Sequence, residues 1–139
     1  DYLGTQITVH YNSAICAHVG YCTSGLPEVF DVKRRPWIKA DATEVERVID
    51  AVRACPSGAL SYSQDGVEHR DHESDPMIVI VPNGPYAVKG GADLQETAFG
   101  EGASHEHLTL CRCGQSKNKP FCSGANWYHH FDEHAPKRD

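Results

Sequence analysis

Six cysteines are the residues of this sequence best suited to chemistry, and they fall into two sets of three. In chain order they are Cys16, Cys22 and Cys55, then Cys111, Cys113 and Cys122. A thiolate is a soft donor that binds zinc, iron and iron–sulfur clusters. Three disulfides would need an oxidising compartment, which nothing in the sequence supports. The cysteines therefore predict two metal centres.

Composition narrows the class of protein. The chain has 139 residues, of which 40% are hydrophobic and 23% charged, as in ordinary globular domains. A formal net charge of -6 argues against nucleic acid as a partner, because phosphate binding needs a basic face. The sequence contains no apolar run of membrane-spanning length, and residues 1–4 carry no signal-peptide pattern. We expect a cytoplasmic protein.

Three short strands and one helix are expected to position the first cysteine set. Residues 6–11 alternate polar and apolar side chains, 28–32 form a second strand candidate, and 59–62 a returning strand. Asp41, followed three residues on by Glu44, matches a capping box. The apolar stripe of the helix that follows consists of Val45, Val48, Ile49 and Val52. Pro56 ends this helix beside Cys55.

The second cysteine set follows a polar linker and a hairpin. Residues 65–76 are polar and unpatterned, which favours a solvated connection. Residues 77–81 are continuously apolar, which predicts a buried strand. A turn at 82–85 and a partner strand at 86–89 complete the hairpin, and 108–110 form a last strand before the cysteines.

The first half resembles the divergent single-cluster ferredoxin-like domains. The resemblance is carried by the C-x-H-x3-C run from Cys16 to Cys22, by Pro36-Trp37-Ile38, and by C-P-S-G-A-L beginning at Cys55. Three thiolates suit a [3Fe–4S] cluster, or a [4Fe–4S] cluster with one ligand that is not cysteine. Val19 occupies the middle ligand position of ferredoxins and cannot ligate. His18 either supplies that ligand or forms a hydrogen bond that tunes the site.

The second half resembles the CDGSH iron–sulfur domain, also called the NEET family. The pattern runs through Cys111, Cys113, Ser116, Pro120 and Cys122. The C-x-C pair can aim both side chains at one iron from an extended segment. The resemblance implies a [2Fe–2S] cluster with three cysteine ligands and a final histidine.

Asn126 stands where the family has that histidine, and Ser123 where it has aspartate. An amide oxygen is a weaker donor than imidazole. Four outcomes stay open: Asn126 ligates, water or an outside ligand replaces it, His129 or His130 ligates, or the cluster is lost.

Three basic residues, Arg112, Lys117 and Lys119, surround the second cysteine set in an otherwise acidic chain. They form either a docking patch for an acidic redox partner or a solvated loop that balances cluster charge. The sequence holds no nucleophile–base pair, phosphate loop or paired carboxylates at catalytic spacing, so no enzyme is predicted.

Together these features predict an α+β protein of two small modules, each built around an iron–sulfur cluster. A ferredoxin-like βαβ-type half spans 1–64, a linker 65–76, and a β-rich CDGSH half 77–139. The predicted function is electron transfer between redox partner proteins. One alternative is a cluster donor to an apo-acceptor or a redox sensor, and another is a zinc-stabilised interaction module without redox activity. Family resemblance implies a homodimer, unless the first half covers that surface and leaves a monomer.

Overall fold

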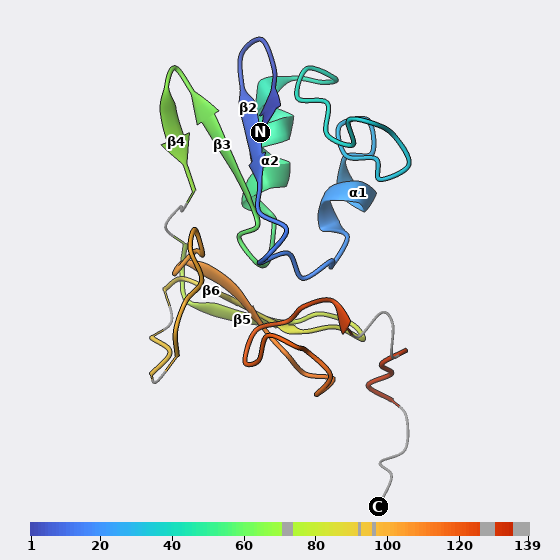
Figure 1. Ribbon diagram of the computed structural model, residues 1–139, viewed down its shortest axis with the longest axis vertical. Coiled ribbons are helices and arrows are strands. Elements are labelled where there is room, and N and C mark those ends of the chain that lie inside the picture. Colours follow the sequence, from blue (N-terminus) through green and yellow to red (C-terminus); the bar gives the residue numbers. More distant parts are fainter. Residues whose placement is uncertain (71–73, 92, 96, 126–129, 135–139) are drawn as a thin grey trace, which may run out of the picture.

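Two antiparallel sheets, one in each half, form the framework (Figure 1). The structure is a computed structural model and describes residues 1–70, 74–91, 93–95, 97–125 and 130–134. In Figure 1 the half that carries the N-terminus lies above the second half along the long axis of the molecule. Helix content is small and confined, among the described elements, to the first half.

The first sheet has four strands in the order β1-β2-β3-β4. Val9 lies opposite Tyr62, so the strands before and after the long 12–59 excursion pair directly. They run antiparallel, which differs from the parallel strands of a βαβ unit. The strands are β1 (Tyr2–Leu3), β2 (Thr8–Tyr11), β3 (Leu60–Gln64) and β4 (Val67–His69).

Two helices lie within that excursion: α1 (Tyr21–Gly25) and α2 (Val45–Arg53). The predicted cap of α2 is wrong. Glu44 occupies the N-cap position and makes no side-chain capping bond. The Asp41 carboxylate instead accepts hydrogen bonds from the Thr5 backbone N–H at 2.8 Å and from the Thr5 hydroxyl at 2.9 Å. A capping-box pattern is local, whereas this contact joins residues 36 positions apart.

The predicted strand at 28–32 is also wrong. Only Phe30 forms a β-bridge there, with Ile38, and the rest of the segment is turn. Phe30 and Val29 are nevertheless almost fully buried. Their apolar character reflects packing in the core rather than strand pairing.

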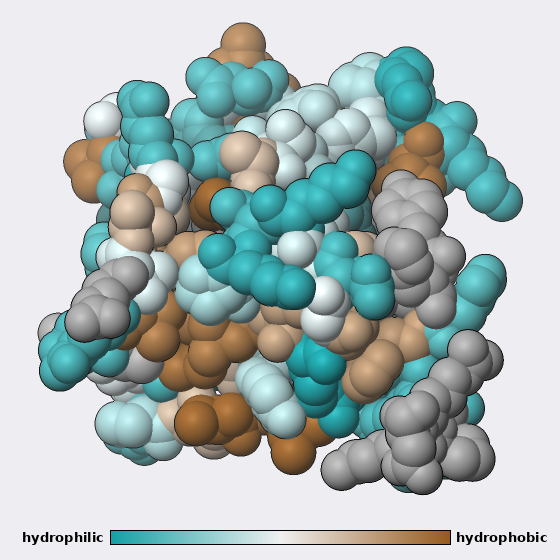
Figure 2. Space-filling model, turned by 60° about the horizontal axis from the view of Figure 1, so that its bottom comes forward, coloured by the Kyte–Doolittle hydropathy of each residue, from teal (hydrophilic) through white to brown (hydrophobic). Residues whose placement is uncertain are grey.

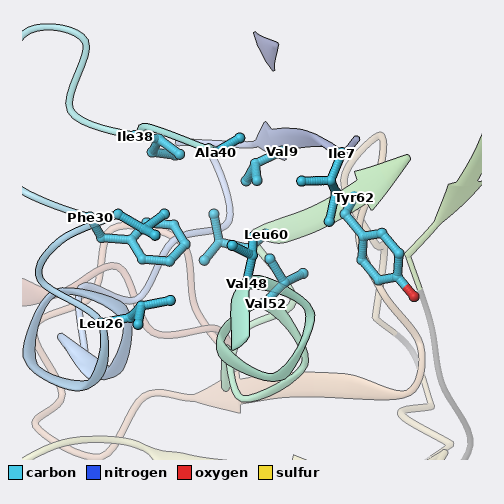
Figure 3. Packing of buried hydrophobic residues seen from close by; sticks show 11 residues of the cluster. Ile7, Val9, Leu26, Phe30, Ile38, Ala40, Val48, Val52, Leu60 and Tyr62 are labelled. Carbon is cyan, nitrogen blue, oxygen red and sulfur yellow. The ribbon is translucent and has the colours of Figure 1, made fainter. Parts of the chain in front are cut away.

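The core of the first half lies between the sheet and α2 (Figure 3). The predicted apolar stripe of α2 is confirmed, because Val48 and Val52 are buried and Val45 and Ile49 pack against the core. Figure 3 shows Val48 and Val52 pointing toward Leu60 on β3. This packing holds both ends of the excursion, and therefore its cysteines, on one side of the sheet.

The second sheet has three strands in the order β5-β6-β7: Met77–Ile80, Tyr86–Lys89 and His107–Leu110. The predicted hairpin is confirmed, with Ile80 opposite Tyr86. The predicted burial of its first strand is wrong, since Met77, Ile78 and Ile80 are 52%, 69% and 58% exposed. β5 is an edge strand, and these three side chains lie at the surface. Figure 2 brings this end of the molecule forward and shows hydrophobic surface there.

The predicted linker is only partly a connection. Within 65–76, β4 extends the first sheet by pairing with β3, and Tyr62 stacks on His69 with ring centroids 4.9 Å apart. Within the described residues, no helix is both long and apolar enough to cross a membrane.

Candidate metal centres

The three thiols of the first half share one cavity. Cys16 lies in the loop after β2, Cys22 in α1, and Cys55 directly after the end of α2. They line an open cavity of about 620 Å³, together with Trp37 and His18. The sheet and α2 therefore bring Cys55 to the same cavity as Cys22, which lies 33 positions earlier in the chain.

Local backbone geometry aims two of these thiols. Gly20 adopts a φ of 86°, a left-handed conformation that glycine takes without strain, and α1 begins immediately after it. Cys55 donates its N–H to the Val52 carbonyl at 3.1 Å, which continues the last turn of α2. Pro56 cannot continue the helix, so Cys55 lies at the point where the helix gives way to a turn.

Burial and mutual repulsion disfavour free thiolates in this cavity. Burial raises the pKa of Cys22 to about 11, and the Cys55 and Cys16 thiols act in the same direction. Burial likewise raises the pKa of Cys16. Three part-buried thiolates would repel one another without a cation between them, so bound iron would compensate their charge.

Cys16 has hydrogen-bond donors already in place. The His18 backbone N–H donates to the Cys16 sulfur at 3.4 Å, and the His18 Nδ1 lies 3.7 Å from the same atom. Tyr11 is the other neighbour of this thiol, and burial together with its interaction with Cys16 raises the pKa of Tyr11. Donors to a ligating sulfur tune the potential of an iron–sulfur site. Tyr11 was missed in the sequence, where its only signal is its place at the end of a strand before the cysteine loop.

In the second half, two thiols are spaced as if to share one metal. The Cys111 and Cys113 sulfurs lie 3.9 Å apart. Two thiolates on one tetrahedral ion, with bonds of about 2.3 Å, stand about 3.8 Å apart. The C-x-C pair therefore has the spacing needed for one iron.

The loop between these thiols and Cys122 is closed by its own hydrogen bonds. The Cys111 backbone N–H donates to the Pro120 carbonyl at 2.7 Å, and the Cys122 backbone N–H donates to the Thr109 carbonyl at 2.9 Å. Inside the loop, the buried Ser116 hydroxyl donates to the Phe121 carbonyl at 2.6 Å. These bonds return the chain beside β7 and bring Cys122 back toward the C-x-C pair.

The thiols of the second half differ in electrostatic environment. Burial raises the pKa of Cys111, but backbone N–H groups of Ser116, Gly114 and Gln115 outweigh burial and hold this pKa below its usual value. Burial raises the pKa of Cys122. Backbone amides thus favour a thiolate at the C-x-C end of the loop.

Arg112 is a clamp inside the second half rather than a free docking residue. Its guanidinium donates to the Gly84 and Val81 carbonyls, each at 2.8 Å, and pairs with the Glu133 carboxylate. Tyr86 and Phe131 lie against the guanidinium, at 5.5 and 5.1 Å from their ring centroids. Lys117 and Lys119 are exposed. The basic docking patch considered above therefore loses its central member.

Two predicted candidates for the last ligand of the second site, Asn126 and His129, lie outside the described residues. His130 is described and exposed, with a φ of 52°. Among the residues that the structure describes, no three His, Cys, Asp or Glu side chains come close enough to hold one metal ion. A cluster needs no three protein ligands on one metal ion, because its ligands are divided among several irons.

Two small modules with three cysteines each define an iron–sulfur domain protein. The family described as divergent 4Fe-4S mono-cluster matches residues 2–65, and the family described as iron-binding zinc finger CDGSH type matches residues 83–125. The chain belongs to both families, one in each half.

Curated relatives support this assignment. The uncharacterized protein YjdI of Escherichia coli strain K12 is 46% identical over 61 residues, which cover 44% of this chain and 80% of the relative. The protein of the same name from Escherichia coli O157:H7 matches to the same extent. No solved structure matches the chain significantly.

Proposed function

We propose that this protein carries single electrons between redox partner proteins, with one iron–sulfur cluster in each half. The observations that carry the proposal are three thiols that line one cavity in the first half and a C-x-C pair of thiols 3.9 Å apart in the second, in modules of two iron–sulfur families. Iron–sulfur clusters supply reversible one-electron chemistry without bond rearrangement in the protein. The chain's part is to hold thiolates, tune them by hydrogen bonds and shield them from water.

At the first site, Cys16, Cys22 and Cys55 would hold a [3Fe–4S] or a [4Fe–4S] cluster. Their common cavity is large and lined mainly by apolar atoms, and burial disfavours uncompensated thiolates there. His18 touches Cys16 through its backbone N–H and its ring, which supports a tuning role for this residue.

At the second site, Cys111, Cys113 and Cys122 would hold a [2Fe–2S] cluster, with Asn126 completing the set. The 3.9 Å spacing of the first two sulfurs supports a shared iron. The Gln115 N–H donates to the Cys113 sulfur and the Gly124 N–H to the Cys122 sulfur, both at 3.4 Å. Such donors offset the negative charge gained on reduction.

The proposal is tested by oxygen-free purification with iron and sulfide analysis and a redox titration followed by EPR. About five irons per chain are expected for a [3Fe–4S] plus a [2Fe–2S] cluster, and about six for a [4Fe–4S] plus a [2Fe–2S] cluster. Cys22→Ala should remove the irons of the first site only, and Cys113→Ala those of the second only. A colourless protein that holds zinc would instead establish the interaction-module alternative.

A second candidate function is cluster donation to an apo-acceptor. It is favoured by the half-exposed Cys111 and Cys113 and by an asparagine in place of the family's histidine. Mixing the loaded protein with an apo-ferredoxin would separate the two functions. Transfer of iron and sulfide identifies a donor, whereas electron exchange with retained iron identifies a carrier.

A further inference from the structure

The two thiol sites touch each other across the boundary between the halves. The Cys122 thiol lies 3.9 Å from the carbonyl oxygen of Ala17, the residue that follows Cys16. Ala17 and Cys122 are both buried, with 2% and 7% of their surface exposed. The two sites therefore meet at a buried contact between residues of different halves.

His18 is in contact with both sites. Its Nδ1 lies 3.7 Å from the Cys16 sulfur. On the other side, its ring lies against Gly124, two residues beyond Cys122. A Cβ atom built on Gly124 would come within 2.7 Å of the His18 Cδ2 and 3.1 Å of the His18 Cβ and Cγ. Only a residue without a side chain therefore fits against His18 at this distance.

We propose that the contact between His18 and Gly124 is a positioning device that holds the two cluster sites side by side, so that an electron crosses between the halves inside one molecule. This inference rests on the proposed function. One electron leaves one site and enters the other, and no bond forms or breaks. The outside donor and acceptor are the one-electron redox proteins of that proposal. Electron transfer weakens steeply with distance, so a fixed short separation favours the internal route.

The carbonyl of Ala17 and the ring of His18 fit this role because each contacts the other half: the carbonyl contacts the Cys122 sulfur, and the ring contacts Gly124. The backbone there is also unusual: His18 has a φ of 54° and Gly124 a φ of 82°. An alanine at position 124 would therefore be strained by its conformation as well as by its neighbour. Gly66, in the turn between β3 and β4, offers a matched control, since it has a φ of 77° but nothing within 4 Å of a built Cβ.

The test uses the full-length loaded protein, fully reduced so that both clusters are paramagnetic, and EPR as the readout. In wild type, the signal of the more easily reduced centre should broaden or split when the second centre becomes reduced. Gly124→Ala should remove this interaction, whereas Gly66→Ala should retain it. The single variant His18→Ala, which removes the ring from the contact without adding bulk, should weaken the interaction as well.

Iron and sulfide analysis of each sample distinguishes a failure of this inference from a failure of the proposed electron-carrier function. If both sites are loaded and the wild-type spectrum equals the sum of two isolated centres, the bridging role is overturned while the carrier function stands. If one or both sites hold no cluster, the carrier function and the inference fall together. An equal loss of the interaction in Gly66→Ala and in Gly124→Ala would show that backbone strain alone causes the loss, and it would overturn the role of the His18 contact.

Discussion

Arg112 and Glu133 form an ion pair, with 2.5 Å between guanidinium nitrogen and carboxylate oxygen, which ties the segment after the last cysteine to the cluster loop. Their side chains are only 16% and 23% exposed. The Glu133 backbone N–H also donates to the Asn83 side chain at 3.1 Å, so the hairpin turn joins the same network. Arg112 sits between two predicted ligands, Cys111 and Cys113. The network therefore supports the second site directly.

Replacing Arg112 with lysine should destabilise the second half. Lysine keeps the charge but cannot bond the Gly84 and Val81 carbonyls and Glu133 together, because it lacks the planar fork of arginine. We expect a loss of about 1.5–3 kcal/mol in the free energy of unfolding. Chemical denaturation measures it, and the decay of the second cluster's absorbance should be faster as well.

The matched control for this change is Arg47→Lys. Arg47 pairs with Glu28 at 3.0 Å, but this pair is 54% and 39% exposed. Exposed pairs contribute little, so a change of no more than about 0.5 kcal/mol is expected. An equal effect of the two substitutions would contradict the clamp.

Glu133→Gln should make the stability of the protein less dependent on pH under acidic conditions. The hydrogen bond from Arg112 holds the pKa of Glu133 below its usual value. A carboxyl whose pKa is depressed on folding stabilises the protein fully above its unfolded pKa of about 4.3. This contribution is lost as the pH falls through the lower folded value. Melting temperatures measured from pH 6 down to pH 3 should therefore drop less steeply in the variant.

Glu28→Gln serves as its comparison, because Glu28 belongs to the exposed pair with Arg47. The wild-type slope should persist in that protein. A Glu133→Gln curve parallel to wild type at every pH would argue that the Arg112 pair contributes nothing to acid stability.

The same type of substitution, isoleucine to alanine, tests the burial of one position in each half. The two variants are Ile38→Ala and Ile78→Ala. Ile38 is 1% exposed and lies in the core of the first half, while Ile78 is 69% exposed on the edge strand β5. We expect a loss of about 2–5 kcal/mol for Ile38→Ala. Ile78→Ala should change stability by no more than about 0.5 kcal/mol. A large cost at Ile78, measured by the same denaturation, would mean that another surface covers β5 in solution.

Ser116→Ala should open the second cluster loop. The buried Ser116 hydroxyl donates to the Phe121 carbonyl at 2.6 Å and accepts from the Asn118 N–H at 3.0 Å. Removing it leaves both groups without this partner, at a cost of about 1–3 kcal/mol. Faster iron release to a chelator should follow. Ser116→Thr, which keeps the hydroxyl, should restore near-wild-type release if the bond rather than the space matters.

The local patterns of the sequence predicted much of this molecule. The spacing of Val45, Val48, Ile49 and Val52 predicted the buried face of α2, because helical periodicity is a property of neighbours in the chain. The turn residues at 82–85 predicted the hairpin of β5 and β6 for the same reason. The cysteine motifs predicted both families, since ligand spacing within a loop is encoded locally.

Long-range contacts decided the rest. Asp41 bonds Thr5 rather than capping α2, Met77 to Ile80 lie on an open edge rather than in a core, and Arg112 clamps Glu133 rather than facing a partner. The approach of Cys122 to Ala17 joins residues 105 positions apart. Residue types and local spacing determined which groups could bind iron. Which of them meet across the two modules depended on the packing of distant segments, and no local pattern encodes that packing.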